Sequence, residues 1–172
     1  MSLHMYQVPR LSGLSGLLVL ILCSAACTAH APERGSNGVG PNNASDSSAH
    51  QAHEAYVSAI NSNDLNTLLG VLTEDVVFLS AHEAPMVGKA AVRPWLEAYL
   101  KAYKTHWDKP VQEFVVNGDW AFERYSYTSN DTPLGGGDVV SDTGWGLALY
   151  HRDTDGKWRV ARDAWGPDHP AK

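Results

Sequence analysis

The feature that most constrains the fold of this sequence is a single change in its hydrophobic periodicity, at Lys109-Pro110. Before this point, apolar residues recur at helical spacing, which predicts helices over about 46–60, 65–72 and 88–103. After it, side chains alternate with the period of two that is typical of strands, over 111–116, 120–128, 143–152 and 158–165. Helices followed by an antiparallel sheet predict the α+β class.

Local signals refine this outline. Residues 61–64 are expected to break the first helix, and Asp64, the last of them, is expected to cap the second helix. Gly88 is expected to begin the third helix. A short apolar run at 76–79 predicts one buried strand between these helices. The polar, glycine-rich segment 130–142 is expected to be a long flexible excursion between two strands.

The first residues have the pattern of an export signal. A compact apolar run over 14–22 is followed by Ser24-Ala25-Ala26-Cys27, which resembles a bacterial lipobox with Ser24 where an aliphatic residue is usual. We therefore expect a lipoprotein signal peptide over 1–27 with lipidation at Cys27, a flexible linker over 28–48 and a folded domain over 49–168. Cleavage after Ala29 by the ordinary signal peptidase is the alternative. In both cases the protein is exported, either anchored by lipid to the bacterial envelope or free in the periplasm or medium.

Composition limits the possible partners. The chain of 172 residues has 44% hydrophobic residues, enough for one core, and a formal net charge of −6 without any cluster of Lys or Arg. Nucleic acid is therefore not an expected partner, because its recognition requires a concentrated basic patch. We expect a membrane to be contacted only through the lipid anchor. Both cysteines, Cys23 and Cys27, lie in the leader, so the exported domain has no internal disulfide.

The closing strand predicts a pocket. Alternation over 155–165 places Ala161, Asp163 and Trp165 on one face, and Trp158 and Val160 on the other. A carboxylate beside a large indole is unusual in plain core, because a buried Asp requires a partner. It is common in ligand pockets, where apolar walls surround a few polar groups.

The order of these elements resembles that of the nuclear transport factor 2-like superfamily, which includes ketosteroid isomerases and polyketide cyclase-like (SnoaL-like) proteins. The resemblance covers about 49–167. It implies a cone-like fold in which three N-terminal helices pack on a curved, mostly antiparallel sheet around an apolar pocket. It also implies a homodimer formed through the sheet.

Ketosteroid isomerases provide a test of the chemistry. Tyr56 matches their oxyanion-hole tyrosine, and Trp165 matches an aromatic residue of their pocket. Their catalytic base, however, falls at Ser80, and their second acid falls at Ala148. Without those two acids the proton transfer of steroid isomerisation has no machinery, so we do not expect that reaction.

The remaining candidates surround this predicted pocket. Arg124 is the expected ion-pair partner of Asp163, on the assumption that Phe122, Arg124 and Ser126 point inward. His82 is expected near the mouth of the cavity, although loop histidines are often exposed and have no functional role. The expected ligand-binding residues are Tyr56, Ser80, His82, Trp95, Arg124, Trp145, Asp163 and Trp165. No metal or other cofactor is expected, since His50 and His53 have neither cysteine nor a tight carboxylate cluster beside them.

Three functions remain open from the sequence. The preferred one is an exported domain that binds a small apolar or aromatic molecule. The first alternative is a cofactor-free acid–base enzyme (a lyase, isomerase or hydrolase) in which Asp163 and Tyr56 are catalytic. The second is a dimeric protein-interaction scaffold. A cavity filled by side chains would favour the scaffold, an open cavity with Asp163 unpaired would favour catalysis, and one with Asp163 paired would favour binding.

Overall fold

The computed structural model describes residues 43–170, in which three helices and seven strands are present. The helices are α1 (Asn43–Asn61), α2 (Leu65–Gly70) and α3 (Lys89–Ala102). The strands are β1 (Leu72–Ser80), β2 (Met86–Val87), β3 (Tyr103–Asp108), β4 (Val111–Asn117), β5 (Trp120–Pro133), β6 (Val140–Arg152) and β7 (Trp158–Pro167). The expected signal peptide with Cys27, and the expected linker up to residue 42, lie outside the described residues.

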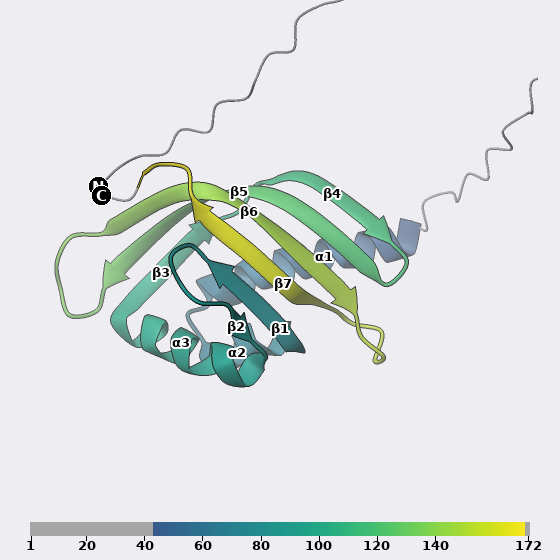
Figure 1. Cartoon of the computed structure of the whole chain (residues 1–172), viewed down its shortest axis with the longest axis horizontal. Helices are drawn as coiled ribbons and strands as arrows, with labels where there is room; N and C mark the ends of the chain where they lie inside the picture. Colours follow the sequence, from purple (N-terminus) through teal and green to yellow (C-terminus); the bar gives the residue numbers. More distant parts are fainter. Residues whose placement is uncertain (1–42, 171–172) are drawn as a thin grey trace, which may run out of the picture. The chain divides into compact units, whose positions relative to one another are not determined.

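The strands form one mixed sheet in the order β2-β1-β7-β6-β5-β3, with β4 also paired to β5 (Figure 1). Only β1 and β7 run parallel, and the other pairs are antiparallel. The long strand β5 pairs with β4 along its first half and with β3 along its second half. Three helices on a mostly antiparallel sheet confirm the predicted α+β class.

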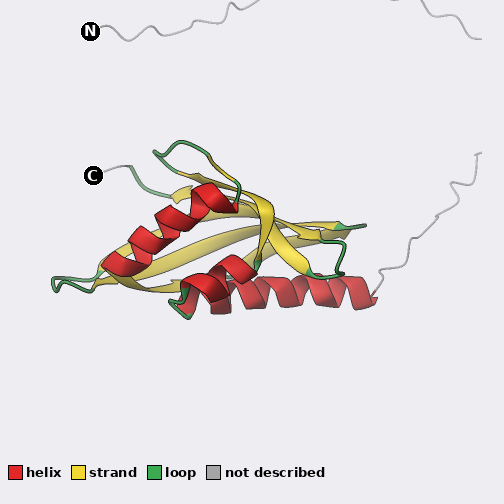
Figure 2. Ribbon diagram, turned by 90° about the horizontal axis from the view of Figure 1, so that it is seen from below, coloured by secondary structure: helices red, strands yellow, loops and turns green. Residues whose placement is uncertain are grey.

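The helices cover one face of this sheet. Figure 1 shows α1 running behind the strands, and Figure 2 shows it lying along one face of the curved sheet. Local sequence explains two of the helix starts: the Asp64 side chain accepts a hydrogen bond from the Thr67 amide at 2.7 Å, and Gly88 takes the positive φ of 83° that precedes α3. Helix α1 begins at Asn43, before the expected start near residue 46. None of the helices in the described part of the chain is long and apolar enough to cross a membrane.

Two sequence predictions about the strands were wrong. Strand β3 follows α3 directly, where no strand was expected. The pairing of β5 with β6 continues to Asp131 and Val140, so the connection between the two strands covers only 134–139 instead of the expected 130–142. In this region the inward side chains are polar, among them Thr105, Ser129 and Asp131, and they line a cavity. The alternation of apolar and polar residues that identifies a strand is therefore absent from the sequence there.

The two faces of the sheet differ sharply in burial. On the inner face, residues such as Tyr125, Tyr150 and Val160 are buried against the helices. The outer face of β6 exposes a row of large apolar side chains, Trp145, Leu147 and Leu149, of which Trp145 is 53% exposed.

Strand β7 contains a register shift that the simple alternation did not anticipate. Val160 pairs with Tyr150 while Arg162 pairs with Leu149, so Ala161 is an extra residue on β7. Val160 and Ala161 are consequently both buried, and Asp163 follows on the same inner face. The predicted inward side of 161–165 is correct, but Trp158 and Val160 are buried as well rather than facing away.

Candidate functional site

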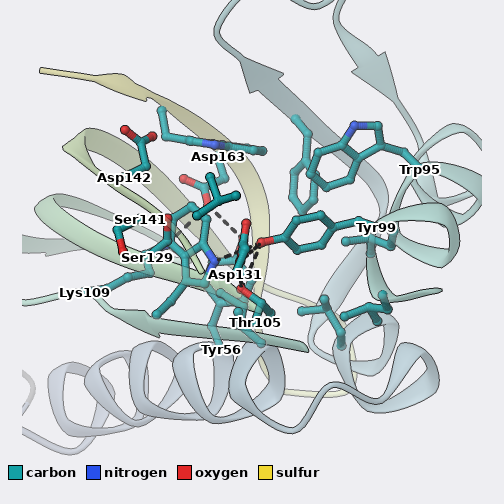
Figure 3. Close-up of a pocket in the computed structure, with 18 of the residues that line it drawn as sticks. Tyr56, Trp95, Tyr99, Thr105, Lys109, Ser129, Asp131, Ser141, Asp142 and Asp163 are labelled. Carbon is teal, nitrogen blue, oxygen red and sulfur yellow. Dashed lines mark hydrogen bonds and ion pairs between the residues drawn. The ribbon is translucent and has the colours of Figure 1, made fainter. Parts of the chain in front are cut away.

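A cavity of about 470 Å³ lies between the helices and the inner face of the sheet. Figure 3 shows Trp95 and Tyr99 entering it from the side of α3 and Tyr56 rising from α1. Six aromatic residues line it: Tyr56, Phe78, Trp95, Tyr99, Trp107 and Trp165. The rings of Phe78, Trp95 and Trp165 pack edge to face, with centroids 5.4–6.4 Å apart. These contacts give the cavity a continuous aromatic wall.

Outside this aromatic wall, the lining of the cavity includes a buried ion pair. The Lys109 ammonium lies 3.3 Å from Oδ2 of Asp163, and both side chains are almost fully buried, at 1% and 3% exposure. The Tyr56 hydroxyl donates to the same oxygen at 2.8 Å, and the Tyr125 hydroxyl donates to Oδ1 at 2.7 Å. Both oxygens of the Asp163 carboxylate therefore have partners, as a buried charge requires.

The two tyrosines also surround the lysine. Nζ of Lys109 lies 3.8 Å from the ring centroid of Tyr125 and 4.4 Å from that of Tyr56, which are cation–π distances. Burial, followed by the negative charge of Asp163, raises the pKa of both phenols well above its usual value. Tyr56 and Tyr125 therefore remain neutral hydrogen-bond donors at any physiological pH.

A glycine explains how Tyr125 reaches Asp163 from two strands away. Tyr125 on β5 pairs with Gly146 on β6, and a methyl group at Gly146 would overlap the Tyr125 ring. Because Gly146 has no side chain, the ring can lie across β6 toward β7. Gly144 accommodates the ring of Tyr127 in the same way.

A second polar cluster, centred on Asp131, lines the same cavity. Oδ1 of Asp131 accepts hydrogen bonds from the Tyr99 hydroxyl at 2.6 Å and from the Thr105 hydroxyl at 2.5 Å. The Trp107 indole N–H points at the Tyr99 oxygen at 3.4 Å. Burial, and then the hydrogen bond to Asp131, raises the pKa of Tyr99.

The third carboxylate of the cavity, Asp142, is paired with a histidine. Its Oδ1 lies 2.8 Å from Nε2 of His169, and its Oδ2 accepts from the Tyr127 hydroxyl at 2.9 Å. The Pro170 carbonyl, and then Asp142, raise the pKa of His169 above its usual 6.5. Asp142 and His169 are both partly open to solvent.

Another buried acid, Glu123, lies close by but outside the cavity wall. Ala148 pairs with Glu123 on one side and with Asp163 on the other, so the two acids flank it in one row across the sheet. Glu123 Oε2 contacts Nδ1 of His53 at 3.0 Å and accepts from the Tyr150 hydroxyl at 2.6 Å. This cluster is packed in the core.

The predicted site residues divide into two groups. Tyr56, Trp95, Asp163 and Trp165 line the cavity together. Ser80 lies beside Trp165 at the end of β1, and His82 is exposed in the following turn, and neither lines the cavity. Trp145 is on the outer face of the sheet.

The expected pair between Arg124 and Asp163 was wrong. Arg124 is exposed and its Nε contacts Glu113 at 3.3 Å. Strand β5 faces inward with the alternate set of residues to the one expected, because this arrangement buries the rings of Tyr125 and Tyr127. Its inward residues are Ala121, Glu123, Tyr125 and Tyr127, rather than Phe122, Arg124 and Ser126.

Sequence reasoning missed Lys109, Tyr125 and Asp131. The signal for Tyr125 was Gly144-Trp145-Gly146, since two glycines on one face of a strand indicate that large neighbouring side chains lie across it. Lys109 had no comparable signal, because lysine side chains are rarely buried and a sequence alone predicts that this one is exposed.

The two histidines near the start of the domain have other contacts. His50 stacks on Phe114 with centroids 4.0 Å apart, and His53 contacts Glu123. Within residues 43–170, no group of three or more His, Cys, Asp or Glu could hold a metal ion.

The chain belongs to the family of SnoaL-like domains, whose model matches residues 53–161. This segment includes Tyr56, Lys109 and Tyr125 and ends just before Asp163. A comparison with curated proteins finds no match.

Solved structures show the same fold. A ketosteroid isomerase-like protein from Erwinia carotovora atroseptica SCRI1043 has a TM-score of 0.68 and 23% identity, over 74% of this chain and 99% of that one. A conserved protein from Planctomyces limnophilus has a TM-score of 0.66 and 25% identity, over 72% of this chain and 96% of that one. An NTF2-like protein with a cystatin-like fold from Novosphingobium aromaticivorans has a TM-score of 0.61 and 18% identity, over 75% and 85% of the two chains. The described domain therefore has the nuclear transport factor 2-like fold.

Proposed function

We propose that this domain binds a small apolar or aromatic molecule in the cavity beneath its helices. The observation that carries the proposal is an open cavity of about 470 Å³ with a continuous aromatic wall, which is a usual size and lining for a small-molecule site. Side chains do not fill this space, and a filled cavity is what would have favoured the scaffold function.

The state of Asp163 favours binding over acid–base catalysis at this residue. A general base needs a lone pair directed at the substrate. The oxygens of Asp163 instead accept from Tyr56 and Tyr125 and pair with Lys109. Asp163 therefore acts as a fixed structural anchor at the edge of the ligand site.

Two tryptophan variants test the proposal. Trp165 lines the cavity, whereas Trp145 is exposed on the outer face, and sequence patterns alone placed both in the pocket. We expect apolar aromatic compounds to quench tryptophan fluorescence saturably, and Trp165→Leu to weaken their binding about tenfold by removing one stacking surface. Trp145→Leu should bind as the wild type does. Absence of saturable quenching by a broad compound set would overturn the proposal.

We also propose that the domain forms a homodimer through the outer face of its sheet. Trp145, Leu147 and Leu149 form an exposed apolar row there, and such patches commonly mark an interface. Light scattering on wild-type protein should give twice the monomer mass, and Leu147→Glu should give the monomer mass. A monomeric wild type at micromolar concentration would contradict this.

Export remains a proposal that rests on the leader sequence. The apolar run and Ser24-Ala25-Ala26-Cys27 support a lipid anchor at Cys27. Cys27→Ala should move the protein from the membrane fraction to the soluble fraction. Unchanged fractionation of this variant would rule out lipidation at Cys27.

A further inference from the structure

The charges that line the cavity are unequal in number. Among the described residues, three carboxylates line it (Asp131, Asp142 and Asp163), against one lysine. That lysine, Lys109, is already paired with Asp163. His169 accompanies Asp142.

Asp131 is the carboxylate whose charge is not compensated. No Lys, Arg or His of residues 43–170 lies within ion-pair distance of it, and its two partners, Tyr99 and Thr105, are neutral hydroxyls that both donate to Oδ1. The raised pKa of Tyr99 keeps that phenol neutral. Oδ2 accepts no hydrogen bond from the described part of the chain.

The cavity already holds an ammonium group in a comparable setting. Lys109 is bound by a carboxylate at 3.3 Å and by two tyrosine rings at 3.8 and 4.4 Å. Aromatic rings also surround Asp131. The Tyr99 hydroxyl donates to Asp131, the Trp107 indole N–H points at the Tyr99 oxygen, and Trp95 stacks on Tyr99 with ring centroids 5.6 Å apart. Aromatic faces beside a carboxylate are the groups that bind organic cations.

We infer that the ligand of this cavity is an organic cation, a protonated amine on an apolar body, whose N–H groups bind Oδ2 of Asp131. This inference rests on the proposed function and specifies the ligand class for the same site. A neutral ligand that covered Asp131 would remove water from an unpaired carboxylate, which is costly. An anionic ligand would be repelled by the carboxylate of Asp131, which has no cationic partner among the described residues. A cation replaces the lost water with a charge-assisted hydrogen bond.

The test compares three ligands that share one apolar body and differ in charge: phenylbutylamine, phenylbutanol and phenylbutanoate. Calorimetric titration of the wild type should give an affinity for the amine about tenfold or more above that for the alcohol, with the carboxylate weakest. In Asp131→Asn, the amine should bind no better than the alcohol, while the affinity for the alcohol is kept. Retained alcohol binding also shows that the variant is folded.

Asp138→Asn is the matched control, because Asp138 is exposed in the connection between β5 and β6, does not line the cavity and loses the same charge. It should behave as the wild type. Equal or tighter binding of the alcohol in the wild type, or an amine preference that survives Asp131→Asn, would overturn the inference but leave the proposed function standing. If none of the three ligands binds, the proposed function fails as well.

Discussion

Asp163 and Glu123 are buried carboxylates in one row of the sheet, separated only by Ala148, yet their surroundings differ. Asp163 faces the cavity and is held by the Lys109 ammonium and two phenols. Glu123 is completely buried in the core and is held by His53 and Tyr150. Within the described residues, its Oε1 has no hydrogen-bond partner.

The two acids differ in the group that is paired with them. Asp163, beside the cavity, is paired with the ammonium group of Lys109, whereas Glu123, in the closed core, is paired with the imidazole of His53. Ala148, the position at which the resemblance to ketosteroid isomerases implied their second acid, lies between these two acids on the neighbouring strands.

The largest expected effect on stability comes from removing Lys109, the ion-pair partner of Asp163. Lys109→Met leaves Asp163 buried without its counter-ion, so we expect the free energy of unfolding to fall by about 3–5 kcal/mol. Urea denaturation monitored by tryptophan fluorescence measures this loss. Lys89→Met is the control, because Lys89 pairs with the exposed Glu74 and should lose less than about 1 kcal/mol. Equal losses in the two variants would show that the Lys109–Asp163 pair has no special role.

A smaller effect is expected on the closed side of the comparison. Glu123→Gln keeps the size of the side chain and one carbonyl acceptor for Tyr150, but weakens the contact with His53. The free energy of unfolding should fall by about 1–3 kcal/mol. Ligand affinity should stay within about twofold of the wild type, because Glu123 does not line the cavity. A large loss of affinity in a variant that is still folded would mean that the two acids act as one unit.

The smallest effect concerns pH and the Asp142–His169 pair. The pKa of His169 is raised, so the side chain gains its proton as pH falls through a value above 6.5, and this proton neutralises Asp142. Affinity for phenylbutylamine should therefore decrease about two- to threefold as pH falls from about 8 to 6, where the amine itself stays charged. In His169→Gln the affinity should be constant over that range. A pH dependence that persists in this variant would assign it to another group.

Much of the fold could be predicted because its signals are local. Asp64 and Gly88 mark helix starts by their own chemistry, and the order of elements matches one superfamily. Strand β3 and the ends of β5 and β6 could not be found, because their inward residues line a cavity and are polar. The extra residue at Ala161 depends on pairing with β6, which a single strand does not reveal.

The site was predictable in part. The resemblance to ketosteroid isomerases indicated Tyr56, and alternation in the closing strand indicated Asp163 and Trp165. The partner of Asp163 was missed because it depends on the phase of β5 and on a buried lysine at the predicted boundary between helices and sheet. The apolar side chain of Phe122 favours a strand in which Phe122 faces inward, but in β5 the buried side chains are those of Tyr125 and Tyr127 on the alternate face.

The six tryptophans allow the most direct test of the central claim that the cavity is the ligand site. Trp95, Trp107 and Trp165 line it, whereas Trp120, Trp145 and Trp158 do not. The indole N–H signals of all six can be followed by nuclear magnetic resonance during titration with phenylbutylamine. We predict that the signals of the first three shift together and saturate while the others stay in place. Shifts confined to Trp120 and Trp145 on the exposed side, or no saturable shift at all, would contradict the claim.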